Sequence, residues 1–375
     1  MIAQRWRTGI LGGGDIAPRY AQSLAQAGNI DFVAAASRSP GSAQRCAAAF
    51  GGQAVTPDEL LSGDLIDALV ILTPPRQHED AIARATERGL AVYCEKPFAL
   101  TPEAAITLAD RAAGHEIMLA AAPAVHLGPS LTRARRLVDE GTIGEVVGGA
   151  ATLVYPGPDK WHHNPDHLFT SGGGPLWDMG VYHLSALVFL LGPVAAVQAT
   201  GSRGRATRII RNGPRSGTAI PVDVPTHVTA IATFVSGASL TLTFSFDGFS
   251  SRAPGLEIYG TEGAITLGHP NDFAAPLHLS TTFGEWSLME DASGWHDNMW
   301  AIGVVEALDA FAQGREPRTS PLFAAHVIDV MAAIERLCHR QGQTTATIET
   351  RCRRPEPIAT YSQFPWQFVS STDQE

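Results

Sequence analysis

The sequence has 375 residues, which exceeds one ordinary domain and suffices for two domains with a hydrophobic core each. Asp and Glu number 37 against 27 Lys and Arg, so the formal net charge is −10, and the basic residues are dispersed. This balance argues against a surface for nucleic acid or for an anionic membrane. A small neutral or mildly polar ligand fits this charge distribution better.

Cysteine usage and hydropathy favour a cytoplasmic protein. The four cysteines are widely spaced and form no C-x-x-C pair, so we expect reduced thiols and neither a zinc site nor a disulfide framework. The longest apolar run, residues 184–197, is interrupted by Gly192-Pro193 and is shorter than the ~20 residues of a membrane helix. A glycine-rich turn follows so soon after the amino terminus that we expect no signal segment.

The first motif is a short apolar strand, residues 8–11, followed by G-x-G-x-x-A and a helical pattern to residue 27. Gly12 allows the tight turn, and Gly14 lets a pyrophosphate approach the backbone at the helix amino end. We expect Asp15 and Ile16, in the same turn, to bind the cofactor as well. Glycine-rich turns are common, but this position in the chain favours a dinucleotide site.

The second strand, residues 31–37, ends on Ser37-Arg38, where an NAD site would place Asp or Glu for the ribose 2′-hydroxyl. A hydroxyl and a guanidinium suit a 2′-phosphate instead, because Arg makes paired hydrogen bonds to phosphate oxygens. The alternative is that Arg38 is a solvated turn residue. The pattern favours NADP, with NAD possible.

A buried strand is expected at residues 68–72, followed by a proline-rich loop at 73–78. Such a loop can lie along a nicotinamide ribose, and we expect Thr73, Pro74 and His78 to contribute to the cofactor site. The alternative is a plain connector before the helix at residues 79–88.

Residues 91–94 form another buried strand, which ends on Glu95, Lys96 and Pro97. Pro97 keeps Lys96 out of the helical region, so the amine is presented at the carboxyl edge of the sheet, where ligands of open α/β sheets bind. We count Glu95 and Lys96 with the cofactor-binding residues. The alternative is a solvated Glu-Lys pair.

Strands and helices alternate up to residue 123, which is typical of an α/β doubly wound parallel sheet and predicts a Rossmann domain at 1–123. Beyond it, hairpin patterns at 228–246 and 256–267 predict an α+β domain, 124–375, with an open, mainly antiparallel sheet. Helical patterns at 300–313 and 323–340 either cover this sheet or return to the first domain.

Three glycines at 172–174 precede a predicted helix that carries Asp178 and Tyr182. Four residues apart on an α-helix, a carboxylate and a phenol share one face. The alternative is a buried tyrosine whose hydroxyl is satisfied by Asp178. Helical geometry turns His183 about 100° away from Tyr182, so we interpret His183 as structural or interfacial.

Residues 161–167 are dense in aromatic and polar groups, and we expect Trp161 and His162 to bind a polyol. Three histidines in this loop allow a zinc interpretation, but the loop has no C-x-x-C or H-E-x-x-H frame, so we predict no metal.

Several motifs occur in a specific order along the chain: the glycine turn, Leu-Thr-Pro-Pro-Arg-Gln-His, Glu-Lys-Pro, Gly-Gly-Gly-Pro-Leu-Trp-Asp-Met-Gly-Val-Tyr and Leu-Glu-Ile-Tyr-Gly-Thr-Glu-Gly-Ala. With these motifs the chain resembles the glucose-fructose oxidoreductase and inositol dehydrogenase (Gfo/Idh/MocA) family. The resemblance runs from about residue 7 to 334. It implies a Rossmann domain, an open-faced sheet domain and catalytic roles for Lys96, Asp178 and Tyr182. It also implies a homodimer or homotetramer joined through the exposed sheet face.

Two positions depart from the family pattern. Ser37-Arg38 replaces the acidic residue of an NAD site, and Ala124 stands where relatives of this subgroup tend to carry an acidic residue. His126 is a candidate replacement at that substrate wall, beside Asp178, Trp161 and His162.

The implied activity is NAD(P)-dependent interconversion of a secondary hydroxyl and a ketone, or of a lactol and a lactone, on a sugar, sugar derivative or cyclitol. Lys96 would favour the phenolate of Tyr182, whose free pKa is about 10, and Asp178 would orient the hydroxyl or the lysine. This scheme requires Lys96 and Tyr182 to converge on the nicotinamide. A lyase or glycosidase that uses transient oxidation and a non-catalytic cofactor-sensing binding protein remain open.

Overall fold

The computed structural model describes residues 5–62, 64–289, 300–339 and 344–359. By its internal contacts the chain divides into two compact units. The first holds the described residues up to Leu127, those of 300–325 and the short stretch from Ile358; the second holds the described residues of 128–289, 326–339 and 344–357. This division is less simple than the expected boundary after residue 123, because the stretch that begins at residue 300 returns to the first unit.

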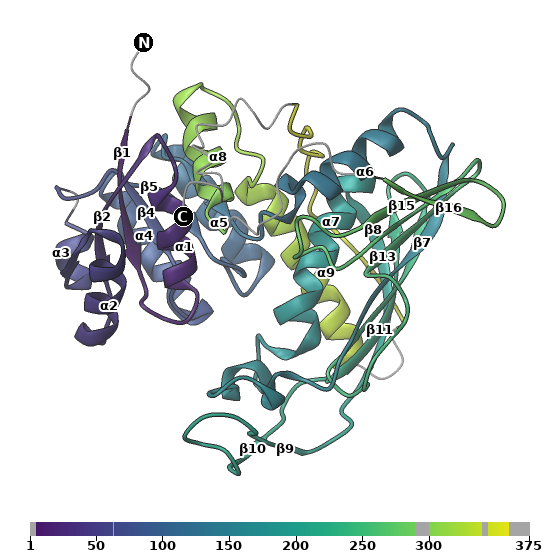
Figure 1. Ribbon diagram of the computed structural model, residues 1–375, viewed down its shortest axis with the longest axis horizontal. Coiled ribbons are helices and arrows are strands. Elements are labelled where there is room, and N and C mark those ends of the chain that lie inside the picture. The colour runs from purple at the N-terminus through teal and green to yellow at the C-terminus, as the bar shows by residue number, and fades with distance from the viewer. Residues whose placement is uncertain (1–4, 63, 290–299, 340–343, 360–375) are drawn as a thin grey trace, which may run out of the picture. The chain divides into compact units, whose positions relative to one another are not determined.

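The first unit is built on a parallel sheet of six strands in the order β3-β2-β1-β4-β5-β6 (Figure 1). The strands are β1 (Trp6–Leu11), β2 (Ile30–Ala36), β3 (Gln53–Val55), β4 (Ala68–Ile71), β5 (Ala91–Cys94) and β6 (Leu119–Ala121). Every residue of β4 and β5 is buried, as the continuous apolar runs predict for strands covered on both faces. The order reverses between β1 and β4, which is where doubly wound sheets bind ligands. The predicted doubly wound Rossmann architecture is confirmed.

The first unit has six helices in its described residues, and those after the glycine turn, near residues 79–88 and near residues 300–313 lie close to the predicted ranges. The six are α1 (Ala17–Ala25), α2 (Pro40–Phe50), α3 (Pro57–Leu60), α4 (His78–Glu87), α5 (Pro102–Gly114) and α8 (Ile302–Ala312). Helix α8 packs against β5 and β6, although almost 200 residues separate it from them. Of the two alternatives for the 300–313 pattern, the structure therefore shows a return to the first domain.

The second unit contains a sheet of nine strands in the order β16-β15-β14-β13-β7-β12-β11-β8-β17. The strands are β7 (Val146–Val154), β8 (Val194–Ser202), β11 (His227–Phe234), β12 (Ser239–Ser245), β13 (Leu256–Gly260), β14 (Ala264–Leu267), β15 (Leu277–Thr282), β16 (Glu285–Met289) and β17 (Thr345–Thr347). All pairs are antiparallel except β7 with β12. The predicted mainly antiparallel sheet and both predicted hairpins are confirmed.

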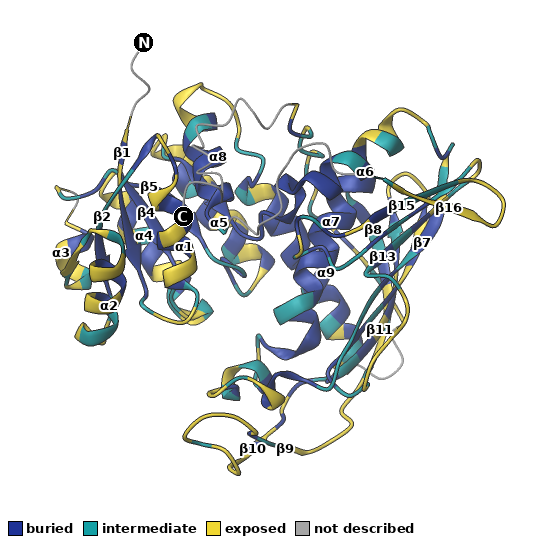
Figure 2. Ribbon diagram, viewed as in Figure 1, coloured by how far each residue is buried: buried dark blue, intermediate teal, exposed yellow. Residues whose placement is uncertain are grey.

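Helices cover one face of this sheet and leave the other face open (Figure 1). They are α6 (Pro129–Asp139), α7 (Val181–Leu191) and α9 (Pro321–His339), the last of which begins in the first unit. Every residue of α7 is buried (Figure 2), so the apolar run of 184–197 is a core helix followed by β8. No helix in the described ranges has the length and apolarity to cross a bilayer.

A small lobe, here residues 155–173 and 203–223, projects from the second unit. It contains the hairpin of β9 (Thr207–Ile209) and β10 (Ala219–Pro221) and the 3-10 turns η3 (Pro158–Lys160) and η4 (Asp166–Phe169). Its own core comprises Phe169, Ile210, Ile220 and Val222 together with Phe246. The sequence analysis did not predict the hairpin, because strands of three residues carry too little alternation to stand out.

Burial lowers the pKa of four buried histidines in the described part of the chain, His78, His126, His183 and His326, and three of these shifts are large. Burial lowers the pKa of His126 in the first unit to about 4, and in the second unit that of His183 to about 3 and that of His326 to about 4. Nε2 of His326 accepts the Val194 N–H at 2.9 Å, which requires an unprotonated nitrogen. Folding therefore excludes protons that the unfolded imidazoles would bind.

We predict a steep loss of stability in mild acid. The unfolded histidines take up protons below about pH 6.5, and the folded ones do so only near pH 4 or lower, so stability present at pH 7 is lost as the pH falls. Each group contributes a slope of about 1.4 kcal/mol per pH unit in that window. Urea unfolding at pH 7, 6 and 5 measures the slope, and a free energy of unfolding that is flat over this range would contradict the prediction.

Candidate active site

The glycine turn lies between the end of β1 and the start of α1. Gly12 has a φ of +118°, and a Cβ built on it would lie 2.6 Å from the carbonyl carbon of Leu72, directly after β4. A Cβ on Gly14 would meet no atom within 4 Å. Gly12 is therefore required by the chain itself, whereas Gly14 leaves open space beside the backbone.

The amino end of α1 is suited to an anion. Ile16 is its N-cap and makes no side-chain capping hydrogen bond, and Ala17 behind it is fully buried. The helix dipole attracts negative charge to this end. The N–H groups of Ala17 and Arg19 already donate to the carbonyl oxygens of Gly14 and Ile16. With the space at Gly14, this end fits the pyrophosphate of a dinucleotide; Asp15 in the same turn is exposed.

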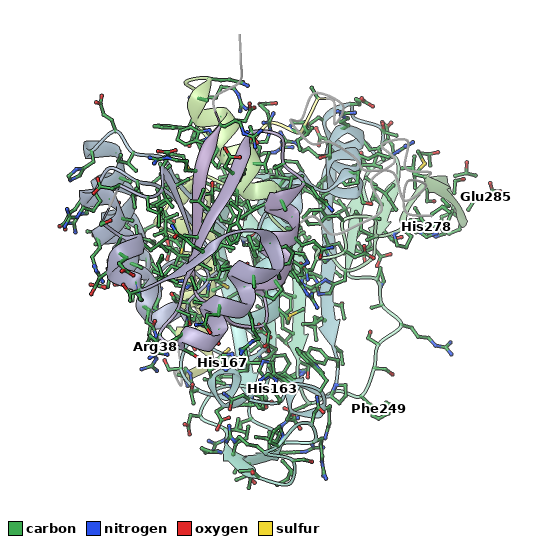
Figure 3. The ribbon with its side chains drawn as sticks, turned by 60° about the vertical axis from the view of Figure 1, so that its left-hand side comes forward. Arg38, His163, His167, Phe249, His278 and Glu285 are labelled. Carbon is green, nitrogen blue, oxygen red and sulfur yellow. The ribbon has the colours of Figure 1, made fainter. Side chains whose placement is uncertain are left out.

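Ser37 and Arg38 follow β2, as expected. Ser37 is partly buried and Arg38 is exposed at the surface of the unit (Figure 3). Within the described part of the chain, the Arg38 guanidinium has no hydrogen bond or ion pair. Arg38 is therefore available to an anionic ligand.

The loop after β4 places Thr73 and His78 differently from expectation. Nδ1 of His78 lies 2.8 Å from the Pro97 carbonyl oxygen and Nε2 lies 2.6 Å from that of Thr73, and the side chain is fully buried. Burial lowers its pKa. His78 has no ring nitrogen left for a ribose, so we correct its expected cofactor contact to a positioning role between these two segments.

The hydroxyl of Thr73 remains a candidate contact. Its Oγ1 is buried and has no hydrogen-bond partner within the described part of the chain. Pro74 next to it is exposed.

Glu95 also acts within the protein. One carboxylate oxygen accepts the Tyr20 hydroxyl of α1 at 2.7 Å, and the other accepts the backbone N–H of Lys96 at 2.8 Å. Tyr20 is buried beside Tyr93 and Trp300. Glu95 thus joins the helix of the glycine turn to the segment that carries Lys96, and its expected role as a direct cofactor ligand stays a prediction.

His126 does not line an accessible wall. It is 1% exposed, its ring packs against Phe323 with centroids 5.0 Å apart, and Nε2 lies 3.0 Å from the Arg318 carbonyl oxygen. Because the ring is buried and both of these contacts are internal to the first unit, we correct its expected substrate contact to a structural role.

In the second unit, Asp178 and Tyr182 lie at a change of helix type. Residues Leu176–Gly180 form a π-helical turn, and α7 begins at Val181. A π turn is wider than an α turn, so the argument that four residues bring both side chains onto one face does not apply unchanged. Asp178 is partly buried and Tyr182 is 7% exposed.

Two histidines pack near Tyr182. The rings of Tyr182 and His269 are 6.2 Å apart, and those of His269 and His183 are 4.8 Å apart. His183 is fully buried, with Nδ1 3.3 Å from the Met179 carbonyl oxygen. His183 is a buried structural residue.

In the lobe, Trp161 is 57% exposed and its ring meets His162 edge-on at 5.5 Å. His162 stacks on His163 at 5.1 Å and lies 5.6 Å from His167; Figure 3 labels the last two. Although these rings cluster, no group of three potential metal ligands occurs among the described residues. Trp161 and His162 therefore form an aromatic surface.

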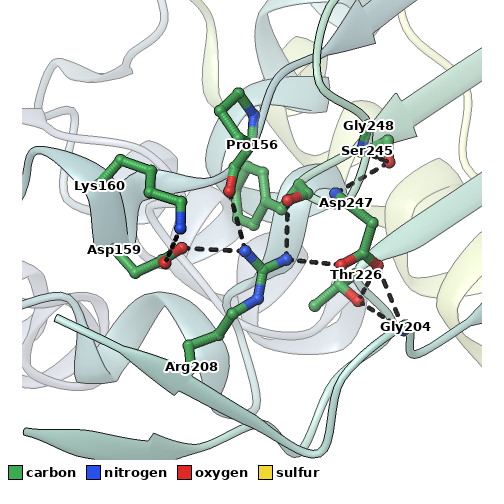
Figure 4. Close-up of polar contacts among 10 residues, drawn as sticks. Pro156, Asp159, Lys160, Gly204, Arg208, Thr226, Ser245, Asp247 and Gly248 are labelled. Atoms are coloured by element: carbon green, nitrogen blue, oxygen red, sulfur yellow. Dashed lines mark hydrogen bonds and ion pairs between the residues drawn. The ribbon is translucent and has the colours of Figure 1, made fainter. Parts of the chain in front are cut away.

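Arg208, which no sequence motif singled out, organises the lobe through its buried guanidinium (Figure 4). Arg208 is 1% exposed and donates to the carboxylates of Asp159 (3.0 Å) and Asp247 (2.6 Å) and to the carbonyl oxygens of Pro156 (2.9 Å) and Phe246 (2.7 Å). A charge this deeply buried persists only with such partners. The sequence does indicate an unusual segment here, because five arginines lie between residues 203 and 215 of a chain with net negative charge.

No sequence motif singled out Tyr155 either. It directly follows β7, its ring meets Phe246 edge-on at 5.1 Å, and it packs with Met179 against the lobe core. Burial, followed by the negative charge of Asp178, raises the pKa of its phenol far above the usual value. Tyr155 therefore belongs to the surroundings of Asp178.

Comparisons with known proteins agree with this architecture. Residues 6–122 match the model "Oxidoreductase family, NAD-binding Rossmann fold", and residues 131–266 match "GFO/IDH/MocA C-terminal domain". The D-xylose 1-dehydrogenase (NADP+) of Haloarcula marismortui is 32% identical over 57% of this chain and 58% of the relative, so the matched stretch spans little more than half of that protein.

Two further matches cover more. The dTDP-3,4-didehydro-2,6-dideoxy-alpha-D-glucose 3-reductase of Streptomyces violaceoruber is 32% identical over 70% of this chain and 72% of the relative. The crystal structure of an NAD binding oxidoreductase from Klebsiella pneumoniae has a TM-score of 0.79 at 21% identity and covers 92% of this chain and 99% of that chain. The latter supports the fold alone.

The two glycines of the turn provide a matched test. Gly12→Ala should destabilise the protein by about 1–3 kcal/mol, because its Cβ meets the end of β4 at a positive φ. Gly14→Val should leave the melting temperature near that of the wild type, yet weaken nicotinamide cofactor binding at least tenfold by filling the open space. Thermal melting and fluorescence titration measure the two effects; unaltered cofactor affinity in Gly14→Val would contradict the assignment of this space.

Proposed function

We propose that this chain, which belongs to the GFO/IDH/MocA family of oxidoreductases, is an NAD(P)-dependent dehydrogenase that interconverts a secondary hydroxyl and a carbonyl on a sugar or cyclitol. The observation that carries the proposal is the arrangement at the carboxyl edge of the parallel sheet. The amino end of α1 and the open space at Gly14 lie at the strand-order reversal, and Glu95 holds α1 and the Lys96 segment together. The names of the sugar-acting relatives support the substrate class.

In the proposed mechanism, the bound nicotinamide supplies the hydride chemistry. Tyr182 takes the proton of the substrate hydroxyl during oxidation and returns it during reduction. The Lys96 ammonium favours the phenolate form of Tyr182, because an opposite charge nearby stabilises the charged state. Asp178 orients the substrate by accepting a hydrogen bond from a second hydroxyl beside the reacting one, or it orients the lysine.

Removal of either acid/base group tests this mechanism. Lys96→Ala and Tyr182→Phe should each lower kcat by at least about 100-fold, which is the usual contribution of acid–base catalysis, with cofactor affinity retained. Tyr259→Phe, which changes a surface phenol that is 40% exposed, serves as the matched control. The assay follows nicotinamide absorbance over a panel of sugars and inositols with both cofactors. Wild-type turnover in either variant would remove that residue from the mechanism.

For the cofactor, we propose a preference for NADP that rests on Arg38. Its guanidinium is exposed and has no partner among the described residues, so it is available to the 2′-phosphate. Arg38→Asp should lower kcat/KM with NADP at least tenfold and reverse the preference toward NAD. Steady-state kinetics with both cofactors measures the ratio; an unaltered ratio would show that Arg38 does not read the 2′-position.

We further propose that the chain forms a homodimer or homotetramer through the open face of the nine-stranded sheet. The strand registers place Ile231 of β11 and Leu288 of β16 in one row across the sheet, and Tyr259 and Trp286 lie on the same face. These four apolar side chains are between 40% and 59% exposed. Exposed apolar groups gathered on one face favour association, and sedimentation that finds only monomer at micromolar concentration would exclude it.

The cytoplasmic location stays a proposal. All four cysteines are free thiols in the structure, which is consistent with a reducing compartment.

A further inference from the structure

The phenol of Tyr155 is held at a defined place where the lobe meets the sheet. Strand β7, which precedes it, runs parallel to β12, and the Tyr155 N–H donates to the Ser245 carbonyl oxygen at 3.1 Å. Its ring packs edge-on against Phe246, the residue after Ser245. Backbone and ring of Tyr155 are thus both attached to the end of β12.

Arg208 holds both backbone segments of this attachment, the one after Tyr155 and the one after β12. One guanidinium nitrogen holds the carbonyl oxygen of Pro156, the residue after Tyr155, and the other holds that of Phe246, against which the phenol ring packs. Asp159 and Asp247 keep the guanidinium in place (Figure 4). The orientation of Tyr155 therefore depends on a buried charge network, and residues 157–159, which follow soon after it, are buried as well.

The same place is adjacent to Asp178. Met179, the residue after Asp178, packs with Tyr155 against the lobe core, and a Cβ on Gly180 would lie 3.1 Å from the Phe244 ring of β12. Tyr155 is partly buried, and its hydroxyl makes no hydrogen bond to another residue of the described chain. A partly buried donor thus lies in the surroundings of the carboxylate to which the proposed mechanism assigns a substrate hydroxyl.

We propose that Tyr155 is a substrate-binding and specificity-determining residue whose phenol donates a hydrogen bond to the sugar hydroxyl adjacent to the one held by Asp178. This proposal rests on the proposed function and specifies its substrate as a compound with two neighbouring hydroxyl groups. Asp178 supplies the acceptor and Tyr155 the donor, which matches a vicinal diol, since each hydroxyl can both donate and accept.

The charge of Asp178 supports this role. Because burial and this carboxylate keep the proton on Tyr155 at all working pH values, the phenol acts as a donor and not as a base. Arg208 acts through Tyr155 and is a positioning residue.

The test is sugar binding without turnover. Calorimetry measures D-xylose, D-glucose and myo-inositol, and their monodeoxy analogues, against protein saturated with reduced cofactor, so that no hydride transfer to it takes place. Tyr155→Phe should weaken binding of the best sugar about tenfold, the effect of losing one hydrogen bond of about 1.4 kcal/mol. One monodeoxy analogue should bind the wild type and Tyr155→Phe equally well, because it lacks the partner hydroxyl. Cofactor affinity should not change, and Tyr259→Phe should bind sugar as the wild type does.

Arg208→Lys separates positioning from folding. It keeps the charge but loses the forked geometry, so it should weaken sugar binding, and adding Tyr155→Phe should then cost much less than it does in the wild type. Fully additive losses would overturn the positioning role. If Arg208→Lys does not fold, Tyr155→Phe decides the proposal alone.

The outcomes distinguish this proposal from the proposed function. Sugars that turn over with the wild type but bind Tyr155→Phe within twofold of the wild type would overturn the role of Tyr155 and leave the dehydrogenase standing. Absence of both binding and turnover for every sugar in the wild type would overturn the proposed function, and the role of Tyr155 with it.

Discussion

The carboxylate of Glu95 is the interaction on which the nucleotide-binding half depends. Its two oxygens are divided between the Tyr20 hydroxyl on α1 and the backbone N–H of Lys96. Since α1 begins at the glycine turn and Lys96 follows β5, one carboxylate sets the geometry of two elements that are separated in sequence. His78 adds a second connection, from the loop after β4 to Pro97. Three carboxyl ends of the parallel sheet are thereby held together by internal hydrogen bonds.

In the second unit, a buried charge holds together segments that are distant in sequence. Its lobe has a small apolar core, which is too little to define the loops around it, and Arg208 supplies the missing contacts. A guanidinium is suited to this because its planar fork holds two carboxylates and two carbonyls at once. Removing one partner of such a network leaves an uncompensated buried charge, which is costly. The lobe is therefore expected to stay ordered as a whole rather than loop by loop.

In both networks, polar side chains bond within the protein and hold in place the residues that are proposed to contact a ligand. Glu95, His78 and Arg208 use their hydrogen-bonding capacity inside the protein, whereas Gly14, Arg38 and Tyr155 keep open space or a donor toward the outside. Such a division is what an enzyme site needs, since contacting groups are held to their productive geometry by residues that do not touch the ligand.

Much of the architecture is readable from the sequence alone. Alternating apolar runs and helical patterns determine the doubly wound sheet, the antiparallel hairpins and the glycine turn, because these follow from local periodicity and from conformations open only to glycine. Residue type does not say whether a polar group faces a ligand or the chain, so His78 and His126 were expected as ligand contacts and have internal partners instead. The π turn at Leu176–Gly180, the hairpin of the lobe and the burial of Arg208 arise only when distant segments pack, and so the tertiary structure alone decided them.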